Sequence, residues 1–313
     1  MPSPRVAVVD IGSNSIKVLV AERTLDGTIA ALHARTLDAR ISAGISRSNP
    51  RLTEASMERG LSAIRELLDG AAPFAPDRYV LVATSAVRDA ENGEDFRARV
   101  QASTHHEIRI LTGKEEAGLI GRGLTCDPAL AGLSDFYVFD LGGGSLECLA
   151  FRDRRIDQAV SLQLGCVRLS EKWVAEPERP IATSALEGIQ SQTKTEVARA
   201  GFRFALASNA TAVGCGGTVT TIRTILAARS GRSLDKTPTR VEVDQLRSLL
   251  LELSALTLSD RKKVSGLPPA RADIFPTALA TLIAVAEQGG FPAYQHSFYN
   301  LRYGLAAEVF DTL

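Results

Sequence analysis

Short apolar runs and small turns alternate at the start of this chain. Residues 6–9 are apolar and mostly β-branched, an Asp-x-Gly turn follows, and residues 16–20 resume the apolar pattern before a turn at 25–28. Apolar runs of strand length, separated by turns rich in Gly, Asn, Ser and Asp, are typical of β-hairpins. The chain is therefore predicted to begin with antiparallel strands.

Farther along, amphipathic stretches alternate with short buried strands. Thr53 precedes a stretch in which Leu61, Ile64, Leu67 and Leu68 share one helical face, and this spacing predicts a helix. Strands alternating with helices indicate the α/β class. By the same criteria we predict strands at 79–82, 108–111 and 212–215, and helices at 115–123, 183–199, 219–228, 243–254 and 303–310.

The hairpin pattern occurs twice in the chain. AVVDIGSNSIKVLV (7–20) aligns without a gap with YVFDLGGGSLECLA (137–150), so that Asp10 lies over Asp140. A repeat of this length and spacing indicates a duplicated domain rather than a solenoid of short units.

The length of the chain, 313 residues, suits two domains. A proline and a glycine within 127–132 mark the boundary between them. We predict domains at 1–130 and 131–302, with the 303–313 helix as a candidate to return to the first domain.

The composition of the chain limits the kinds of partner that it is expected to bind. Lys and Arg total 36, and Asp and Glu also total 36, so a polyanion must be held by a local basic site, and nucleic acid is not an expected partner. No apolar run reaches the about 18 residues of a membrane span, and Gly12 follows Met1 by only 11 positions, too few for a signal peptide. We therefore predict a cytoplasmic protein with reduced cysteines and no membrane partner. Whether it is a homodimer is left open.

Three glycine- or serine-rich turns are candidates to bind phosphate. Successive backbone N–H groups in such turns form a concavity for anions, and glycine allows close approach. The turns are 12–15, 142–145 and 214–218, and the last of them opens a helix, whose N-terminal N–H groups also favour an anion. None of them matches a Walker A loop or a dinucleotide fingerprint.

Six motifs in order carry a family resemblance: Asp10-Ile-Gly-Ser-Asn-Ser15, Thr84-Ser-Ala-Val-Arg88, Gly113-Lys-Glu-Glu-Ala117, Asp140-Leu-Gly-Gly-Gly-Ser145 with Glu147, Gly165-Cys-Val-Arg-Leu169 and Gly214-Cys-Gly-Gly-Thr218. Over nearly its whole length the chain resembles the exopolyphosphatase/guanosine pentaphosphatase (Ppx/GppA) family, in its short two-domain form. The resemblance implies two duplicated actin/Hsp70-like ATPase (ribonuclease H-like) domains with an interdomain cleft. It also implies release of phosphate from the end of polyphosphate or of guanosine pentaphosphate.

The resemblance gives each matched residue an expected role. Glu116 is expected to be the general base that activates water, Arg88 to grip the transferring phosphoryl group, and Asp10 to orient water or metal. Asp140 and Glu147 are expected to hold Mg²⁺, a hard cation that prefers oxygen ligands. The terminal phosphates are expected at Ser13, Asn14, Ser15, Gly143, Gly144, Ser145, Gly216, Gly217 and Thr218.

Several of these residues also have a plainer interpretation. Glu116 is consistent with a solvated helix glutamate and is easily confused with its neighbour Glu115. Arg88 is consistent with a surface ion pair to Asp89 or Glu91. Asp10 is consistent with a turn cap.

Other positions leave alternatives open. Arg168 and the basic run 261–263 are candidates to guide a polyanion, although a solvated face explains the run better, and the orientation of Lys17 is undecided. Two departures from the family pattern have open effects. Leu146 stands where a hydroxyl residue is often found, and the segment 296–304 replaces a Gly-Leu-Arg-Glu-Gly pattern.

The leading functional hypothesis is a Mg²⁺-dependent exopolyphosphatase. The same chemistry on guanosine pentaphosphate is the close alternative, and no residue in the sequence separates the two. An actin-fold kinase or ATPase and a non-catalytic guanosine tetraphosphate-binding protein are further alternatives, because fold alone does not decide function.

Overall fold

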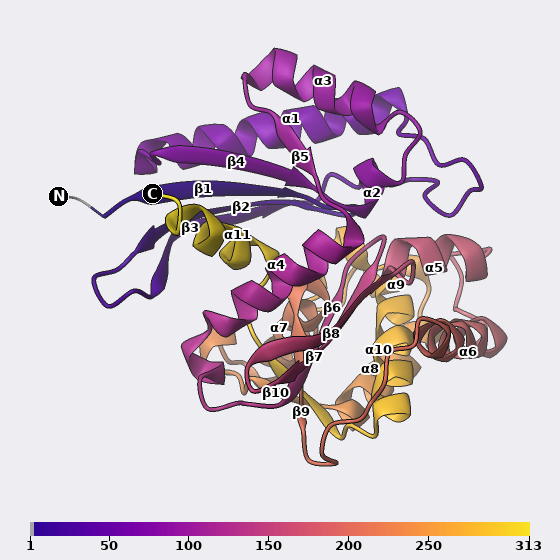
Figure 1. The fold of residues 1–313 in the computed structure, drawn as a ribbon. Helices are drawn as coiled ribbons and strands as arrows, with labels where there is room; N and C mark the ends of the chain where they lie inside the picture. Colours follow the sequence, from indigo (N-terminus) through magenta and orange to yellow (C-terminus); the bar gives the residue numbers. More distant parts are fainter. Residues whose placement is uncertain (1–2) are drawn as a thin grey trace. The chain divides into compact units, whose positions relative to one another are not determined.

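The computed structural model describes residues 3–313 (Figure 1). The chain divides into two compact units. The first contains the residues up to 131 together with 299–313, and the second contains 132–298.

The first unit is built on a five-stranded sheet in the order β3-β2-β1-β4-β5. The first three strands form an antiparallel meander, while β4 and β5 run parallel to β1. The strands are β1 (Arg5–Ile11), β2 (Ile16–Arg23), β3 (Ile29–Leu37), β4 (Arg78–Ala83) and β5 (Ile108–Ile110), and the helices are α1 (Glu54–Ala71), α2 (Ser85–Arg88), α3 (Gly93–Thr104), α4 (Gly113–Thr125) and α11 (Leu301–Phe310).

The core of this unit lies on both faces of β1 and β2. Residues 6–11 of β1 are buried throughout because helices cover the sheet on both sides. Helix α1 packs on one face, and α11 packs on the other face beside α4 (Figure 1). An unbroken apolar run such as 6–9 is what burial on both faces requires.

Helix α11 crosses α4 at glycines of both helices. A Cβ added at Gly304 would lie 1.8 Å from the Leu119 carbonyl oxygen, and one added at Gly123 would lie 2.0 Å from the Asn300 carbonyl oxygen. Asp311, just after α11, accepts hydrogen bonds from Arg23 of β2 and Arg122 of α4. The last helix is thus an integral part of the first unit.

The second unit is built on a six-stranded sheet in the order β10-β11-β9-β6-β7-β8. Strands β6, β7 and β8 form the antiparallel meander, while β9 and β11 run parallel to β6. The strands are β6 (Phe136–Leu141), β7 (Leu146–Arg152), β8 (Arg155–Leu162), β9 (Thr211–Cys215), β10 (Arg240–Glu242) and β11 (Ala293–His296), and the helices are α5 (Cys166–Trp173), α6 (Thr183–Arg199), α7 (Gly216–Ser230), α8 (Val243–Ala255), α9 (Leu258–Arg261) and α10 (Phe275–Gly289).

The two units share one topology. The order β8-β7-β6-β9-β11 repeats β3-β2-β1-β4-β5, with the same parallel and antiparallel pairs. Each meander begins with the same closed turn, in which Gly12 N donates to Ser15 O at 3.2 Å and Gly142 N donates to Ser145 O at 3.0 Å. This is the ribonuclease H-like domain of the actin/Hsp70-like ATPases present twice, and the predicted duplicated α/β fold is confirmed.

No helix within residues 3–313 has both the length and the apolar character needed to cross a lipid bilayer.

Candidate active site

In each unit, the carboxyl ends of the parallel strands meet at one edge of the sheet, where ligands bind in open α/β sheets. At this edge of the first unit, β1 leads into the 12–15 turn, β4 leads into α2, and β5 leads into α4. At the same edge of the second unit, β6 leads into the 142–145 turn, β9 leads into α7, and β11 leads into residues 297–298.

Glu116 and Arg88 form an ion pair in the first unit. Arg88 Nη1 donates to Glu116 Oε2 at 2.8 Å and to the Leu111 carbonyl oxygen at 3.1 Å. Glu116 is only 6% exposed. Arg88 is the last residue of the short helix α2, and its Nε also donates to Asp89 Oδ1 at 3.3 Å. The glutamate is therefore not a solvated helix residue, and Arg88 contacts Glu116 as well as Asp89.

Glu115 has a different task from its neighbour. It closes a capping box with Thr112 at the start of α4 and pairs with Arg109 at 2.9 Å. Hydrogen bonds from Thr112 and the nearby Arg109 guanidinium lower the pKa of Glu115 from 4.5 to about 2. The Glu115 carboxylate is thus committed to the helix cap, whereas that of Glu116 is paired with Arg88.

Asp10 lies near Lys17 at the end of the first hairpin. The two residues are directly opposite each other on β1 and β2, with Lys17 Nζ 3.7 Å from Asp10 Oδ2. The carboxylate is thus partly neutralised by an ammonium group from the neighbouring strand, and Lys17 faces Asp10.

The first turn is held from two sides. Ser13 Oγ is 2.9 Å from Ser85 Oγ of α2, and Asn14 Oδ1 accepts a hydrogen bond from Arg40 Nε at 3.2 Å. Ser13, Asn14 and Ser15 are all buried. The Asn14 amide nitrogen has no partner within residues 3–313, so a donor at the end of the hairpin is left for another group.

Asp140 and Glu147 are directly opposite each other on β6 and β7. Side chains opposite each other in an antiparallel pair lie on the same face, with Cβ atoms about 5 Å apart. The Ser161 hydroxyl donates to Glu147 Oε1 at 2.7 Å, and Glu147 is 2% exposed. Glu147 occupies the place that Lys17 has in the first unit, so the repeated hairpin carries two carboxylates in one copy and an ion pair in the other.

The second turn directs its carbonyl groups toward α5. The Gly142 carbonyl oxygen accepts from Cys166 N at 3.0 Å, and the Gly143 carbonyl oxygen accepts from Val167 N at 2.9 Å. The Gly144 carbonyl oxygen accepts from Arg168 Nε at 3.1 Å. Because C=O and N–H point in opposite directions in a trans peptide, the N–H groups that follow these carbonyls point away from α5.

The third glycine cluster contacts the carboxylate of Asp140. Gly216 has φ +77°, and a Cβ added to it would lie 2.1 Å from Asp140 Oδ1. The Thr218 hydroxyl donates to the Leu141 carbonyl oxygen at 2.8 Å, which ties the start of α7 to the end of β6. Gly216 therefore provides a close approach that no other residue type allows.

Arg271 was missed by the sequence reasoning. A Cβ added at Gly217 would lie 2.5 Å from Arg271 Nη2, so the guanidinium lies against the start of α7. Within residues 3–313 this guanidinium has no hydrogen-bond or ion-pair partner. Its only signal in the sequence was an arginine in the loop before a long apolar stretch, which is too common to single out.

Two other basic groups serve the scaffold. Arg261 is fully buried and donates to the carbonyl oxygens of Leu256, Pro177, Arg179 and Ala272. The expectation that the 261–263 run forms a solvated or polyanion-guiding face is therefore wrong at Arg261. Arg168, the other candidate guide, supports the second turn through Gly144.

The segment 296–304 is divided between the two units. Its first residues end β11 in the second unit, and its last residues begin α11 in the first unit, where Asn300 caps the helix by accepting from Arg302 N at 3.2 Å. The divergent segment thus still forms a capped helix. Leu146 is fully buried at the start of β7.

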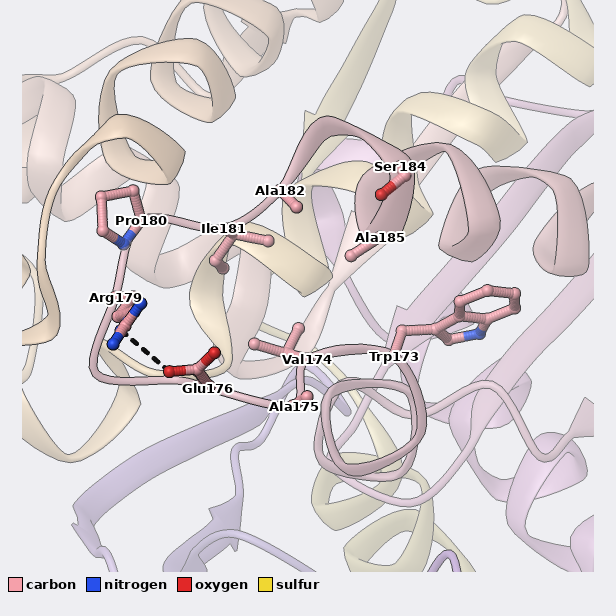
Figure 2. Close-up of a pocket in the computed structure, with 10 residues that line it drawn as sticks. All are labelled: Trp173, Val174, Ala175, Glu176, Arg179, Pro180, Ile181, Ala182, Ser184 and Ala185. Atoms are coloured by element: carbon pink, nitrogen blue, oxygen red, sulfur yellow. Dashed lines mark ion pairs between the residues drawn. The ribbon is translucent and has the colours of Figure 1, made fainter.

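A separate hollow of about 370 Å³ lies between α5 and α6 of the second unit (Figure 2). Trp173, Ile181 and Ala185 give it an apolar lining, and Glu176 pairs with Arg179 at its side at 2.8 Å. None of the predicted site residues is among those that line it.

Mg²⁺ fits the pair of carboxylates on β6 and β7. Within residues 3–313, no group of three or more His, Cys, Asp or Glu side chains gathers as a ready metal site. Mg²⁺ usually keeps several waters and binds through one or two carboxylates plus substrate phosphates. Asp140 and Glu147 match that donor set, whereas Lys17 makes the equivalent place beside Asp10 unsuitable.

Solved structures share this fold. An exopolyphosphatase from Cytophaga hutchinsonii has 22% sequence identity and a TM-score of 0.88, covering 99% of this chain and 98% of its own. The Ppx/GppA family member from Aquifex aeolicus has 22% identity and a TM-score of 0.79, covering 99% of both chains. These likenesses show that the chain shares the fold of these proteins over nearly its whole length.

The sequence places the chain within one family of that fold. The model of the Ppx/GppA phosphatase family matches residues 19–311, and the chain belongs to this family. A guanosine-5'-triphosphate,3'-diphosphate pyrophosphatase of Aeromonas hydrophila is 29% identical over 308 residues, which are 97% of this chain and 59% of that protein. Its counterpart in Aeromonas salmonicida is 29% identical over 91% of this chain and 55% of its own length. The chain thus spans less than two thirds of the length of these curated relatives.

Proposed function

We propose that the chain is a Mg²⁺-dependent exopolyphosphatase that hydrolyses the terminal phosphoanhydride of inorganic polyphosphate, with Glu116 as the general base. The observation that carries this proposal is the ion pair between the buried Glu116 and the partly exposed Arg88, 2.8 Å apart, at the carboxyl edge of the first sheet. A carboxylate that receives a proton next to a guanidinium that binds phosphate oxygens is a combination suited to phosphoryl transfer to water.

The proposed reaction uses each group once. The oxygen of a water molecule attacks the terminal phosphorus while Glu116 accepts a proton from that water. The bond from this phosphorus to the bridging oxygen breaks, and the shortened chain leaves with the bonding pair. Arg88 stabilises negative charge on the transferring group. Mg²⁺ held by Asp140 and Glu147 would supply further charge neutralisation on phosphate oxygens.

The proposed phosphate sites are the turns of the two hairpins and the start of α7. Their support is the set of donors described above: the N–H groups after the Gly142–Gly144 carbonyls, the Asn14 amide, and the Arg271 guanidinium over Gly217. Each of these donors binds phosphate oxygens, which polyphosphate and guanosine pentaphosphate share.

Guanosine pentaphosphate is the alternative substrate, because the curated relatives are named for it. A parallel assay of phosphate release distinguishes the possibilities. Purified protein with Mg²⁺ is offered long polyphosphate, tripolyphosphate, guanosine pentaphosphate and ATP, the last with and without candidate sugars. We expect the highest kcat/KM on a polyphosphate. Preference for guanosine pentaphosphate would support the alternative, sugar-dependent consumption of ATP would support a kinase, and tight nucleotide binding without release from any substrate would support a binding protein.

A further inference from the structure

Phe298 exposes an aromatic ring on the segment that follows β11. Its side chain is 48% exposed, and it follows β11 at the carboxyl edge of the second sheet. Ser297 N donates to the Gly214 carbonyl oxygen at 3.1 Å, so the segment that carries the ring is bonded directly to the cluster. Ligands of open α/β sheets bind at the carboxyl ends of the strands, so an exposed ring at this edge is placed to contact one.

The ring of Phe298 packs against two side chains, Arg223 and His296. Arg223 lies over it, with the guanidinium carbon 5.5 Å from the ring centroid, and the ring of His296 meets it edge to face at 4.6 Å. Arg223 is almost fully buried, and its donors are held by the carbonyl oxygens of Leu234, Thr237 and Pro238. The ring therefore packs against a buried side chain that is fixed by hydrogen bonds.

His296 connects Arg223 to the third glycine cluster through hydrogen bonds. Arg223 Nη1 donates to His296 Nδ1 at 2.8 Å, so the histidine proton is on Nε2, which lies 3.1 Å from Thr220 Oγ1. The Thr220 hydroxyl donates in turn to the Gly216 carbonyl oxygen at 2.8 Å. Burial and the charge of Arg223 lower the pKa of His296 to about 3, so the histidine stays neutral and the chain of bonds is intact at physiological pH.

We propose that the exposed ring of Phe298 is a stacking platform for the purine base of guanosine polyphosphates. It is then the residue that separates these substrates from inorganic polyphosphate, which has no ring to stack. The proposal rests on the proposed function in one respect, namely that the glycine cluster binds phosphate. The base would then bind to Phe298 and the phosphates to the third glycine cluster, and hydrogen bonds within the second unit join the two.

The gain in affinity is expected from stacking of the base on the π face of Phe298 and from the rigidity of that ring. Stacking one base on an aromatic side chain typically changes affinity by a factor of about 5 to 150. A ring already fixed by Arg223 and His296 loses little conformational freedom on binding, so more of that gain appears as affinity. Removing the ring is expected to weaken guanosine pentaphosphate selectively.

The test compares Phe298→Ala with Phe298→Trp, and uses Leu251→Ala as the control. Leu251 is an apolar side chain on α8 with 76% exposure, so its removal controls for loss of an exposed apolar group. Dissociation constants for guanosine pentaphosphate and for tripolyphosphate are measured by calorimetry with Mg²⁺, and kcat/KM is measured on both. We expect Phe298→Ala to lose about 5- to 150-fold on guanosine pentaphosphate. Tripolyphosphate is expected to change by less than about twofold, and Phe298→Trp and Leu251→Ala are expected to behave as the wild type.

Equal losses on both ligands, or no loss on guanosine pentaphosphate, would overturn the proposal. Absence of phosphate release from either compound would instead refute the proposed hydrolysis, while the calorimetric comparison would still decide the role of Phe298.

Discussion

Glu115 and Glu116 are neighbours on one helix, and the same substitution in each separates catalysis from stability. In Glu116→Gln the side chain keeps its size and can still accept the hydrogen bond from Arg88, now 2.8 Å away, but it can no longer take a proton from water. A positioned general base is typically worth 10²- to 10⁴-fold in rate, about 3 to 5 kcal/mol in activation free energy. We expect kcat for phosphate release to fall by that factor.

Both substitutions should change the free energy of unfolding by less than Glu116→Gln changes the activation free energy. Glu116→Gln loses the charge but not the geometry of the bond to Arg88, so we expect a cost of about 1–2 kcal/mol. Glu115→Gln keeps the capping-box pattern, in which Gln also serves, and loses a half-exposed ion pair with Arg109, worth at most about 1 kcal/mol after solvent screening. Its activity should stay close to that of the wild type.

The lowered pKa of Glu115 fixes the sign of the pH dependence. A carboxyl group whose pKa falls from 4.5 to about 2 on folding stabilises the folded state fully above pH 4.5, and this contribution is lost as pH falls through about 2. The stability difference between wild type and Glu115→Gln should therefore vanish in strong acid. Denaturant melts and phosphate-release assays on both variants test the reasoning. Glu116 is not the base if Glu116→Gln keeps more than about a tenth of wild-type kcat. The same conclusion follows if Glu115→Gln loses as much activity as Glu116→Gln.

Three further outcomes follow from the fold and the site. Glu147→Gln should weaken binding of Mn²⁺, measured by calorimetry as a proxy for Mg²⁺, by about tenfold or more; unchanged affinity would remove Glu147 from the metal site. Lys17→Glu recreates beside Asp10 the two-carboxylate pair of the second hairpin, so the number of Mn²⁺ ions bound per chain should rise by one, and unchanged stoichiometry would contradict the equivalence of the two hairpins. Gly123→Ala should destabilise the first unit by about 3 kcal/mol or more, because its Cβ would lie 2.0 Å from a carbonyl oxygen of the segment before α11. Gly118→Ala, on the same helix with open space around it, should instead raise stability by about 0.5–1 kcal/mol in thermal or denaturant melts.

Elements with a clear polar face were predictable from the sequence. Helix α6 spans Thr183–Arg199 as expected, and α1 begins directly after Thr53, where the sequence predicted a helix to open. Helix α10 was not predicted, because its residues are buried from Phe275 to Ala286 on all sides, and a helix without a polar face has no amphipathic period to detect. Strand β8 was missed for a related reason, since it is largely exposed and polar at its start.

Motifs in the sequence nominate candidate site residues, but the partners of each candidate side chain depend on tertiary contacts. Residue type and spacing alone do not separate Glu115 from Glu116, but the hydrogen bonds of Thr112 and Arg88 show that the two carboxylates have different partners. In the same way, Arg261 looked like part of a basic run, but its surroundings are backbone carbonyls contributed by distant segments. Such partners are set by the packing of the whole unit, which local pattern does not contain.

The discontinuity of the first unit also sets an order of events during synthesis. Residues 132–298, which form the whole of the second unit, leave the ribosome before α11 does. At about 5–20 residues per second, this interval lasts on the order of 10 seconds or more. During that time the face of β1 and β2 that α11 covers, and the glycine surface of α4, have no cover from this helix. The N-terminal half of the chain is therefore expected to mature after the C-terminal half, and to depend most on chaperones while it waits.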